Sequence, residues 1–422
     1  MDEKIINRKY PTKRLKFVVT INDDTLTDET DPDFEINYID IGNVDSTGKI
    51  NEIINYKFSE APSRARRKVK HKDVIISTVR TYLRAIASID FEMENLIVST
   101  GFAVIRPKRN VFDPNFCKYS LIESNFIDEV QKRSVGVSYP AINASDLGDI
   151  YLPIPSLEQQ NKIVHYLDRE IAKIDALIEK KTKLIALLEE KKKAVINQAV
   201  TKGLDTTVAM KDSGIEWLGE IPEHWEVNKI SRVFDSIGSG TTPTSSNLEY
   251  YQDGNHSWLI TSDLNDSYIF ETSKKITDAA VYDFSALKLF PSNSLVIAMY
   301  GATIGKTGLT KIECYTNQAC CVISNSTKVH IRYAHFYFIA MKQNLVNLSN
   351  GGGQPNISQG IIRDFKIVYP NLIEQEKIIN FLENKIEETD LTIQKIIKTI
   401  NLLKEKRTAI ISAAINGEIN LD

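Results

Sequence analysis

The residues with the clearest chemistry are cationic, and they cluster in the first half of the chain. Residues 64–72 read Arg-Ala-Arg-Arg-Lys-Val-Lys-His-Lys. Lysine and arginine can pair with phosphates, and an arginine fork can read the edge of a guanine in the major groove of DNA. The alternative is a solvated charged face, because most runs of charge need no ligand. The candidate DNA contacts in this half are Arg64, Arg66, Arg67, Lys68, Arg80, Tyr82, Arg84 and Tyr139.

The second half is less basic and offers two glycine-bearing loops. Residues 301–307 read Gly-Ala-Thr-Ile-Gly-Lys-Thr, which is one residue short of the nucleotide-binding pattern GxxxxGK[ST]. The residues that follow look like a strand, where that pattern requires a helix. We therefore expect a turn between two strands, which could present polar side chains to a ligand. These side chains are Tyr300, Thr303 and Lys306.

The other loop, residues 350–358, reads Asn-Gly-Gly-Gly-Gln-Pro-Asn-Ile-Ser. Its three glycines allow the backbone to approach a ligand closely. Gln354 and Asn356 each carry a donor and an acceptor, so either can pair bidentately with adenine. The alternative is a flexible loop that binds nothing.

No catalytic or metal-binding pattern is present in the sequence. There is no HExxH, GxSxG or GxGxxG, and no NPPY tetrapeptide of an adenine methyltransferase. The six histidines have no metal-ligand spacing, and the four cysteines form no CxxC pair. We expect no catalytic residue, no metal and no cofactor in this chain.

Composition bounds the class of protein. The chain has 422 residues, which predicts about two to four domains. Its 42% apolar and 25% charged residues are typical of a globular protein, and no run approaches the roughly 18 apolar residues of a spanning helix. The charged start has no apolar leader, so we expect no signal peptide and no membrane. Four cysteines cannot form a disulfide framework, so we expect a reducing cytoplasm. A net charge of −3 argues against a uniformly basic binder, but a local basic face suffices.

An internal repeat organises the chain. Residues 155–200 align with residues 370–415 at an offset of 215 without a gap, and 19 of these 46 positions are identical. Weaker anchors lie upstream, where Pro140-Ala-Ile-Asn matches Pro355-Asn-Ile-Ser. The chain is therefore a tandem duplication with two similar and two dissimilar segments.

The similar segments are expected to be long helices. Apolar residues recur at alternating spacings of four and three without an internal proline or glycine, which is a heptad pattern. Each helix of about 46 residues would be about 69 Å long. We expect the two to pack as an antiparallel intramolecular coiled coil; the alternative is that each packs on its own domain. The pairing residues would be Leu167, Ile171, Ile174, Ile178, Ile185, Leu188, Leu382, Ile386, Ile393, Ile396, Ile400 and Leu403.

The dissimilar segments read as mixed α/β domains of about 150 residues. Alternating or buried apolar runs predict strands near residues 34–41, 73–79, 101–105, 257–260, 294–300 and 318–323, with short helices near 115–132 and 331–348. The expected class is α+β, with two such domains, two long helices and a pseudo-two-fold axis. The expected division is a first domain at 1–154, a helix at 155–202, a linker at 203–217, a second domain at 218–369 and a helix at 370–417.

Several segments resemble the specificity subunits of type I restriction-modification systems. Residues 210–227, which include Ser-Gly-Ile-Glu-Trp-Leu-Gly-Glu-Ile-Pro, are similar to the entry segment of that family. Pro155-Ser-Leu-Glu-Gln-Gln and Pro370-Asn-Leu-Ile-Glu-Gln are similar to the starts of its two helical regions. Residues 299–306 and 354–358 resemble segments of its target-recognition domains. The first half departs from the pattern, since it begins without the SGIEWLGEIP part.

The resemblance implies a non-catalytic reader of double-stranded DNA. Each target-recognition domain would read one half of a bipartite sequence, and the helices would set the spacing and dock two methyltransferase (modification) subunits. Those partners would bind S-adenosylmethionine and methylate adenine, and motor-nuclease (restriction) subunits would use ATP and Mg. Two alternatives remain, a coiled-coil scaffold whose β-rich domains bind protein, and a fused enzyme with its own chemistry.

Overall fold

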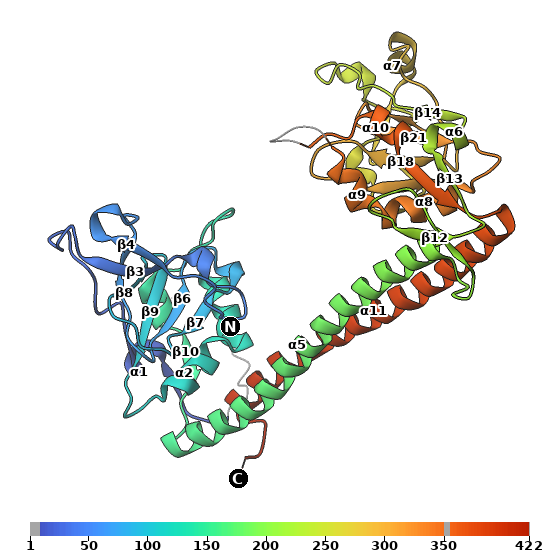
Figure 1. Ribbon diagram of the computed structural model, residues 1–422. Coiled ribbons are helices and arrows are strands. Elements are labelled where there is room, and N and C mark those ends of the chain that lie inside the picture. Colours follow the sequence, from blue (N-terminus) through green and yellow to red (C-terminus); the bar gives the residue numbers. More distant parts are fainter. Residues whose placement is uncertain (1–8, 350–354, 422) are drawn as a thin grey trace. The chain divides into compact units, whose positions relative to one another are not determined.

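The computed structural model describes residues 9–349 and 355–421. The chain divides into two compact units. Unit 1 contains the residues up to Thr182 and those from Ile397 onward, and unit 2 contains Lys183–Ile396. Each unit holds one mixed α/β body and a part of each of two long helices (Figure 1). The predicted mixture of helices and strands is confirmed. Within the described ranges, no helix combines the length and apolar character needed to cross a membrane.

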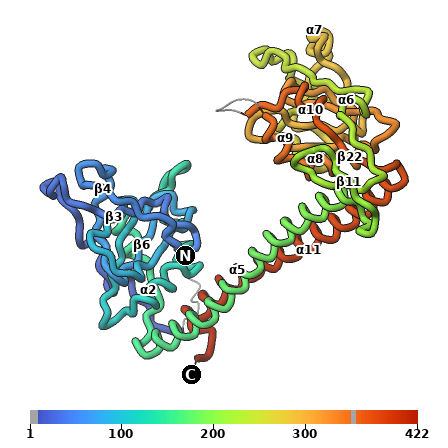
Figure 2. The backbone as a smooth tube through the Cα atoms, viewed as in Figure 1, coloured from blue at the N-terminus to red at the C-terminus, as the bar shows by residue number. Residues whose placement is uncertain are grey.

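The two longest elements are α5 (Leu157–Lys202) and α11 (Leu372–Ile415). Both begin two residues after a proline and are followed by a glycine in the left-handed region, Gly203 and Gly417, each with φ of 76°. Glycine adopts this conformation without a Cβ clash, which is why it stops helices. In each unit the part of α5 lies beside the part of α11 (Figure 2).

Ion pairs join the helices in both units. In unit 1, Arg407 Nε lies 3.1 Å from Asp175 Oδ1, and in unit 2, Lys192 Nζ lies 2.7 Å from Asp390 Oδ1. Adding 215 to the numbers of Asp175 and Lys192 gives Asp390 and Arg407, so the two ion pairs are equivalent in the repeat. In each unit, therefore, an ion pair links the two helices at an equivalent position of the repeat. Every residue of the expected heptad seam is buried or half-buried in its unit.

The body of unit 1 contains two four-stranded sheets. Around the central strand β6 (Val74–Ser77), the strands of the first sheet are all antiparallel. That sheet has the order β2 (Val19–Ile21), β9 (Phe102–Pro107), β6 and β7 (Ile86–Ser88). The second has the order β4 (Ile54–Lys57), β3 (Glu35–Ile39), β8 (Leu96–Ser99) and β5 (Ala65–Lys68). The remaining elements are β1 (Thr12–Arg14) paired with β10 (Tyr151–Pro153), α1 (Leu15–Val18), α2 (Pro114–Leu121), α3 (Ser124–Arg133) and α4 (Ala144–Gly148).

The body of unit 2 repeats this plan around its central strand β18 (Leu295–Ala298). Its five-stranded sheet has the order β14 (Ser236–Gly238), β21 (Cys320–Ser324), β18, β19 (Thr307–Thr310) and β16 (Ser267–Ile269). A second sheet has the order β17 (Lys274–Ile276), β15 (His256–Leu259) and β20 (Tyr315–Thr316). The other elements are β13 (Glu226–Lys229) paired with β22 (Lys366–Tyr369), α6 (Ile230–Val233), α7 (Asp278–Asp283), α8 (Ile331–Ala340), α9 (Lys342–Asn347) and α10 (Gln359–Asp364).

Residues 203–217, expected to be a linker, hold more structure than that. They contain β11 (Met210–Asp212), which pairs antiparallel with β12 (Glu220–Pro222). Ile215 is buried in the core of unit 2, and Gly214 and Gly219 have positive φ angles that allow the tight connection. The apolar residues of this segment follow no helical period. The sequence therefore did not predict the hairpin.

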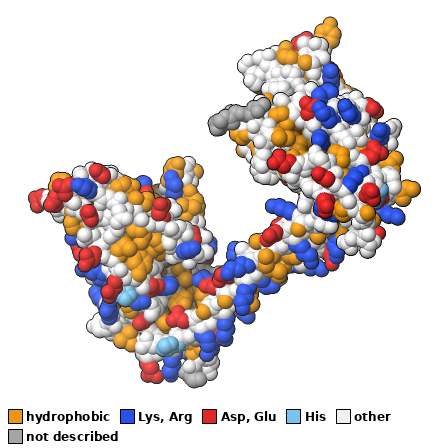
Figure 3. Space-filling model, viewed as in Figure 1, with side chains coloured by type: hydrophobic (Ala, Val, Ile, Leu, Met, Phe, Trp, Pro, Cys, Tyr) orange, Lys and Arg blue, Asp and Glu red, His pale blue; other side chains and the backbone are white. Residues whose placement is uncertain are grey.

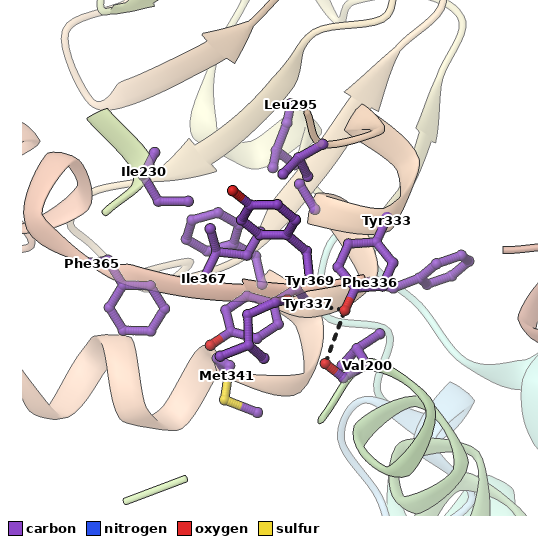
Figure 4. Packing of buried hydrophobic residues seen from close by; sticks show 14 of the residues in the cluster. Val200, Ile230, Leu295, Tyr333, Phe336, Tyr337, Met341, Phe365, Ile367 and Tyr369 are labelled. Carbon is purple, nitrogen blue, oxygen red and sulfur yellow. Dashed lines mark hydrogen bonds between the residues drawn. The ribbon is translucent and has the colours of Figure 1, made fainter. Parts of the chain in front are cut away.

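Both long helices contribute to the core of each unit. In unit 2, Tyr333 Oη donates a hydrogen bond of 3.1 Å to the carbonyl oxygen of Val200, which anchors the end of α5 among aromatic residues (Figure 4). The buried helix residues in unit 2 are Ile196, Ala199, Val200, Ile378, Ile379 and Leu382. Those in unit 1 are Ile411, Ala414, Ile415, Ile163, Val164, Leu167 and Ile171, and the counterpart of Ile171 in unit 2, Ile386, is partly buried. The two sets correspond at the offset of 215, so the repeat duplicates the packing.

A buried glutamine fastens each body to its long helix. Gln160 Oε1 accepts from the backbone nitrogen of Asp113 at 2.8 Å, and its Nε2 donates to the carbonyl oxygens of Val111 and Pro155 at 2.9 Å. In unit 2, Gln375 makes the same three bonds with His330, Lys328 and Pro370. Asp113 and His330 are the N-caps of α2 and α8. Both N–H donors of each buried amide are therefore used, and its oxygen accepts one hydrogen bond.

Replacing Gln160 by alanine should lower the free energy of unfolding of unit 1. The change leaves a buried N–H and two carbonyl oxygens without partners, which costs about 1–3 kcal/mol for each unsatisfied group. Denaturant unfolding of the full chain would measure the loss. Glu158→Ala, at an exposed position with only an i,i+4 ion pair to Lys162, is the matched control and should cost under about 0.5 kcal/mol. Equal effects of both variants would contradict the role given to Gln160.

Candidate nucleic-acid interface

The basic run of residues 64–72 lies on and around β5, and most of its charge is paired. The carboxylates that neutralise it come mainly from the acidic segment Asp23–Asp33 and from loops next to β3 and β7. The closeness of Asp40 raises the pKa of Arg64. The ion pairs are Arg64–Asp40 at 2.5 Å, Arg66–Asp28, Lys68–Asp24 and Lys70–Asp24 at 3.4 Å, and Lys72–Asp90 at 2.9 Å. Five of the six lysines and arginines of the run therefore have an ion-pair partner, and Asp24 is shared by two of them.

Arg67 is turned into the body of unit 1. Its Nη1 donates to Asn22 Oδ1 at 2.6 Å and to the carbonyl oxygen of Phe102. Burial lowers the pKa of the Arg67 guanidinium, which no carboxylate approaches in any recorded ion pair of the described residues. The same Asn22 Oδ1 accepts from the backbone nitrogen of Val104 at 2.9 Å. Arg67 therefore joins β5 to β9 and serves the fold.

The other four candidates of the first half are brought together by two loops. One loop, Val79–Arg84, leaves β6, and the other, Ser134–Ala141, lies between α3 and α4. Val79 and Ala141 form an antiparallel bridge, and Thr81 Oγ1 lies 3.0 Å from Ser134 Oγ. The Arg80 guanidinium stands 4.9 Å from the centre of the Tyr139 ring. Exposed aromatic and guanidinium groups thus share one surface.

The backbone of the first loop is strained at two points. Arg80 and Arg84 flank the short 3₁₀ helix η3 (Thr81–Leu83), and both have positive φ angles, 51° and 52°. Residues other than glycine, asparagine and aspartate seldom adopt positive φ angles. Those that do cluster at functional sites. Within residues 9–349 and 355–421, neither arginine has an ion-pair partner. Their charges are available to an anion.

Unit 2 has an equivalent pair of loops with different side chains. Tyr300, at the end of β18, bridges Asn356, and Ile357 N donates to Met299 O at 2.7 Å. In unit 1, Ile142 N donates to Thr78 O at 2.9 Å in the same way. The chain then turns and enters β19, which confirms a turn between strands and excludes the helix of a nucleotide-binding loop.

The side chains of the second unit differ in how they are placed. Thr303 and Lys306 sit in this turn, where Lys306 N donates to Thr303 O at 2.9 Å, and both are half-buried. Asn356 is exposed and Tyr300 is half-buried. Gln354 lies outside the described residues. The structure therefore brings Tyr300, Thr303, Lys306 and Asn356 to one end of the central sheet.

Sequence reasoning missed the apolar part of this surface in unit 1. Val135 and Val137 are 81% and 101% exposed, beside Tyr139 at 65%. No sequence signal marked their exposure, because Val135 and Val137 alternate with glycine and serine as residues of a buried strand would. Within the part of the chain that the structure describes, no three His, Cys, Asp or Glu side chains are grouped as metal ligands would be.

Comparisons with known proteins identify the family. The description "type I restriction modification DNA specificity domain" matches residues 7–187 and again residues 222–402. The HindI specificity subunit of Haemophilus influenzae is 24% identical over 87% of this chain and 90% of its own length. The MjaVIII specificity subunit of Methanocaldococcus jannaschii is 27% identical over 73% of each chain.

Solved structures share the fold. A chain from a study of complex assembly and conformational transition of the type I R-M system has a TM-score of 0.73 at 23% identity, and covers 99% of this chain and 100% of its own. The HsdS subunit from Thermoanaerobacter tengcongensis has a TM-score of 0.54 at 23% identity, with 97% of each chain covered. This chain therefore belongs to the family of type I restriction modification DNA specificity domains, and it carries two copies of that domain.

Proposed function

We propose that this chain is the DNA-reading subunit of a type I restriction-modification complex and that each unit reads one half of a bipartite target. One observation carries the proposal: the same backbone frame occurs twice, and it holds two loops with unlike side chains each time. The bridges Val79–Ala141 and Tyr300–Asn356 mark equivalent points of the two frames. A shared frame with unlike loops suits two readers of unlike sequences.

The two sets of loops suit different readouts. Unit 1 offers Arg80, Arg84 and Tyr139, which can contact guanine, phosphate and base edges. Unit 2 offers Thr303, Lys306 and Asn356, and asparagine is suited to adenine. Because most hydrogen bonds to DNA go to phosphates and only base contacts specify sequence, the loops are where specificity would reside.

The long helices would hold the two readers apart. We infer that α5 and α11 pair along their length as an antiparallel coiled coil with pseudo-two-fold symmetry. The equivalent ion pairs Asp175–Arg407 and Asp390–Lys192 support one register throughout. A helix of 46 residues spans about 69 Å, which bounds the separation of the half-sites at about 20 base pairs.

The helices would also dock the partner subunits. Basic and apolar side chains are both exposed along them (Figure 3), and Leu187 and Leu402, at equivalent positions, are 60% and 54% exposed. Two equivalent surfaces fit two identical modification subunits, as two-fold symmetry requires. In this proposal S-adenosylmethionine, ATP and Mg belong to the modification and restriction subunits, and the complex acts in the cytoplasm. The family favours DNA over protein as the ligand of the β-rich bodies.

Methylome sequencing tests the proposal directly. A host that expresses this chain with the modification subunit encoded beside it should gain one modified sequence with two defined halves and an undefined spacer. A host that expresses the modification subunit alone is the control and should lack it. The same methylation in both hosts would remove the specificity role.

Arginine substitutions should separate the loop charges from the β5 charges. In the assembled complex, Arg80→Ala or Arg84→Ala should weaken DNA binding and lower the slope of log affinity against log salt by about one. Arg66→Ala should change the slope less, since Asp28 already neutralises Arg66. Binding titrations at several salt concentrations would measure both. A larger change in slope for Arg66→Ala would place the phosphate path on β5 instead.

A further inference from the structure

Two loops of unit 1 form a single apolar projection, defined here as Val79–Arg84 together with Ser134–Ala141. The second loop is a hairpin, in which Val135 N donates to Ala141 O at 2.9 Å and Ala141 N donates to Val135 O at 3.0 Å. It stands out from the body of unit 1, where the ribbon is teal (Figure 1). Gly136 turns the chain with φ of 117°.

This projection exposes large apolar side chains together. Val135, Val137 and Tyr139 are 81%, 101% and 65% exposed, and Tyr82 and Leu83 are 52% and 40% exposed. Such side chains scattered singly are ordinary, but a contiguous group marks a binding surface. None of the recorded contacts of the described residues covers Val137.

The charge of the projection indicates a polyanion as the partner. Its fourteen positions contain two arginines and no aspartate or glutamate. Unlike most of the β5 cations, Arg80 and Arg84 form no ion pair within the described residues, although Arg84 lines a pocket together with Asp128. An apolar surface of a protein partner would not require the unpaired charges of the two arginines. A DNA duplex has phosphates that can pair with them, on either side of a groove that contains apolar groups.

The exposed valines have a chemical match in the major groove of DNA. There the C5-methyl group of thymine is an apolar target for apolar side chains, and the Ser134–Ala141 loop, closed by the single bridge Val135–Ala141, presents them. We propose that the Ser134–Ala141 hairpin enters the major groove and that Val135 and Val137 recognise thymine through this methyl group, with Arg80 and Arg84 on the flanking phosphates. This rests on the proposed function and adds the kind of base that unit 1 reads.

The projection is held in shape before it meets DNA. The Arg80 guanidinium packs over Tyr139, Thr81 N donates to Pro140 O at 3.4 Å, and the bridge Val79–Ala141 closes its base. A loop fixed in its bound shape loses less conformational entropy on binding. The valines would therefore read a methyl group at a defined position.

Uracil is the matched probe, because it differs from thymine only in lacking that methyl group. The full chain assembled with its modification subunits is titrated with duplexes of the site found by methylome sequencing, each with one thymine replaced by uracil. At least one thymine of one half-site should bind about fourfold more weakly as uracil, the value of one buried methyl group. Val137→Ser should bind both duplexes equally.

The control variant is Phe17→Ser, whose side chain is 61% exposed in the same unit but outside the projection. It should keep the preference for thymine over uracil. The proposal is overturned if neither half-site contains thymine, if no replacement weakens binding, or if Val137→Ser retains the preference. It is also overturned if Val137→Ser instead blocks assembly with the modification subunits, which would make the projection a protein contact. Failure of the proposed function differs, since no defined bipartite site would then exist.

Discussion

Replacing residues 1–154 by the corresponding domain of another family member should change one half of the methylated sequence completely and leave the other half as it was. The reason is that the loops of unit 1 belong to a body whose first and last strands pair with each other. β1 and β10 pair at its base, from Thr12 opposite Pro153 to Arg14 opposite Tyr151, so the chain enters and leaves the body at one place. Methylome sequencing would read both halves at once.

The reciprocal exchange of residues 218–369 is the matched control. Its ends meet in the same way, because β13 pairs with β22 from Glu226 opposite Tyr369 to Lys229 opposite Lys366. It should change the half that the first exchange left alone. Change in both halves, or in neither, from a folded chimera would contradict separate readout by the two units.

A chimera could fail to fold for a reason visible in the core. Ile411, Ala414 and Ile415 of α11 pack into the body of unit 1, so a donor domain must accept these side chains. A smaller graft avoids this problem: the donor's loops at Val79–Arg84 and Ser134–Ala141 replace only those loops. This variant should change the same half-site, at least in part, if these loops carry the readout.

The long helices could be predicted from the sequence because their signals are local. A heptad pattern, a proline before each start and Gly203 and Gly417 after each end lie within about 50 residues of chain. The internal repeat also indicated more than two similar helices. Gln160 and Gln375, which are related by the offset of 215, make the same three hydrogen bonds. Identity between two halves of one chain marks positions where the packing is the same.

The role of the basic run could not be predicted, because it depends on residues distant in the sequence. Asp24 and Asp28 lie about 40 residues before Arg66 and Lys68, and the isolated bridge Thr25–Arg67 brings the two segments together. No charge count along the chain reveals such pairing. Conversely, Arg80 and Tyr139 are 59 positions apart, and only the bridge between Val79 and Ala141 makes them neighbours.

Exposure of the hairpin valines was hidden for a similar reason. Valine in a short apolar run reads as buried strand, and Val135 and Val137 alternate with glycine and serine as a strand would. The run lies between α3 and α4, where no sheet is available to cover it. The candidate DNA contact therefore lies where the local sequence pattern predicts burial and the tertiary structure leaves the side chains exposed.

Lengthening the helix pair should lengthen the spacer of the DNA target. Three heptads inserted after Lys183 in α5 and three after Lys398 in α11 extend both helices at opposite points, judged from the pairs Asp175–Arg407 and Lys192–Asp390. The added 21 residues rise about 32 Å, close to one turn of DNA, so the spacer should grow by about nine base pairs. Selection from duplexes with randomised spacer length would measure it.

Two matched variants show whether the helices act as a ruler. The same insertion in α5 alone moves Lys192 and the buried Ile196, Ala199 and Val200 away from their partners, so binding should be lost. One heptad in both helices adds about 10 Å, about a third of a DNA turn, and would present the second unit to the wrong side of the duplex. We therefore expect the double three-heptad variant to bind and both others to fail. A spacer of unchanged length in the three-heptad variant would show that partner subunits, and not α5 and α11, set the separation.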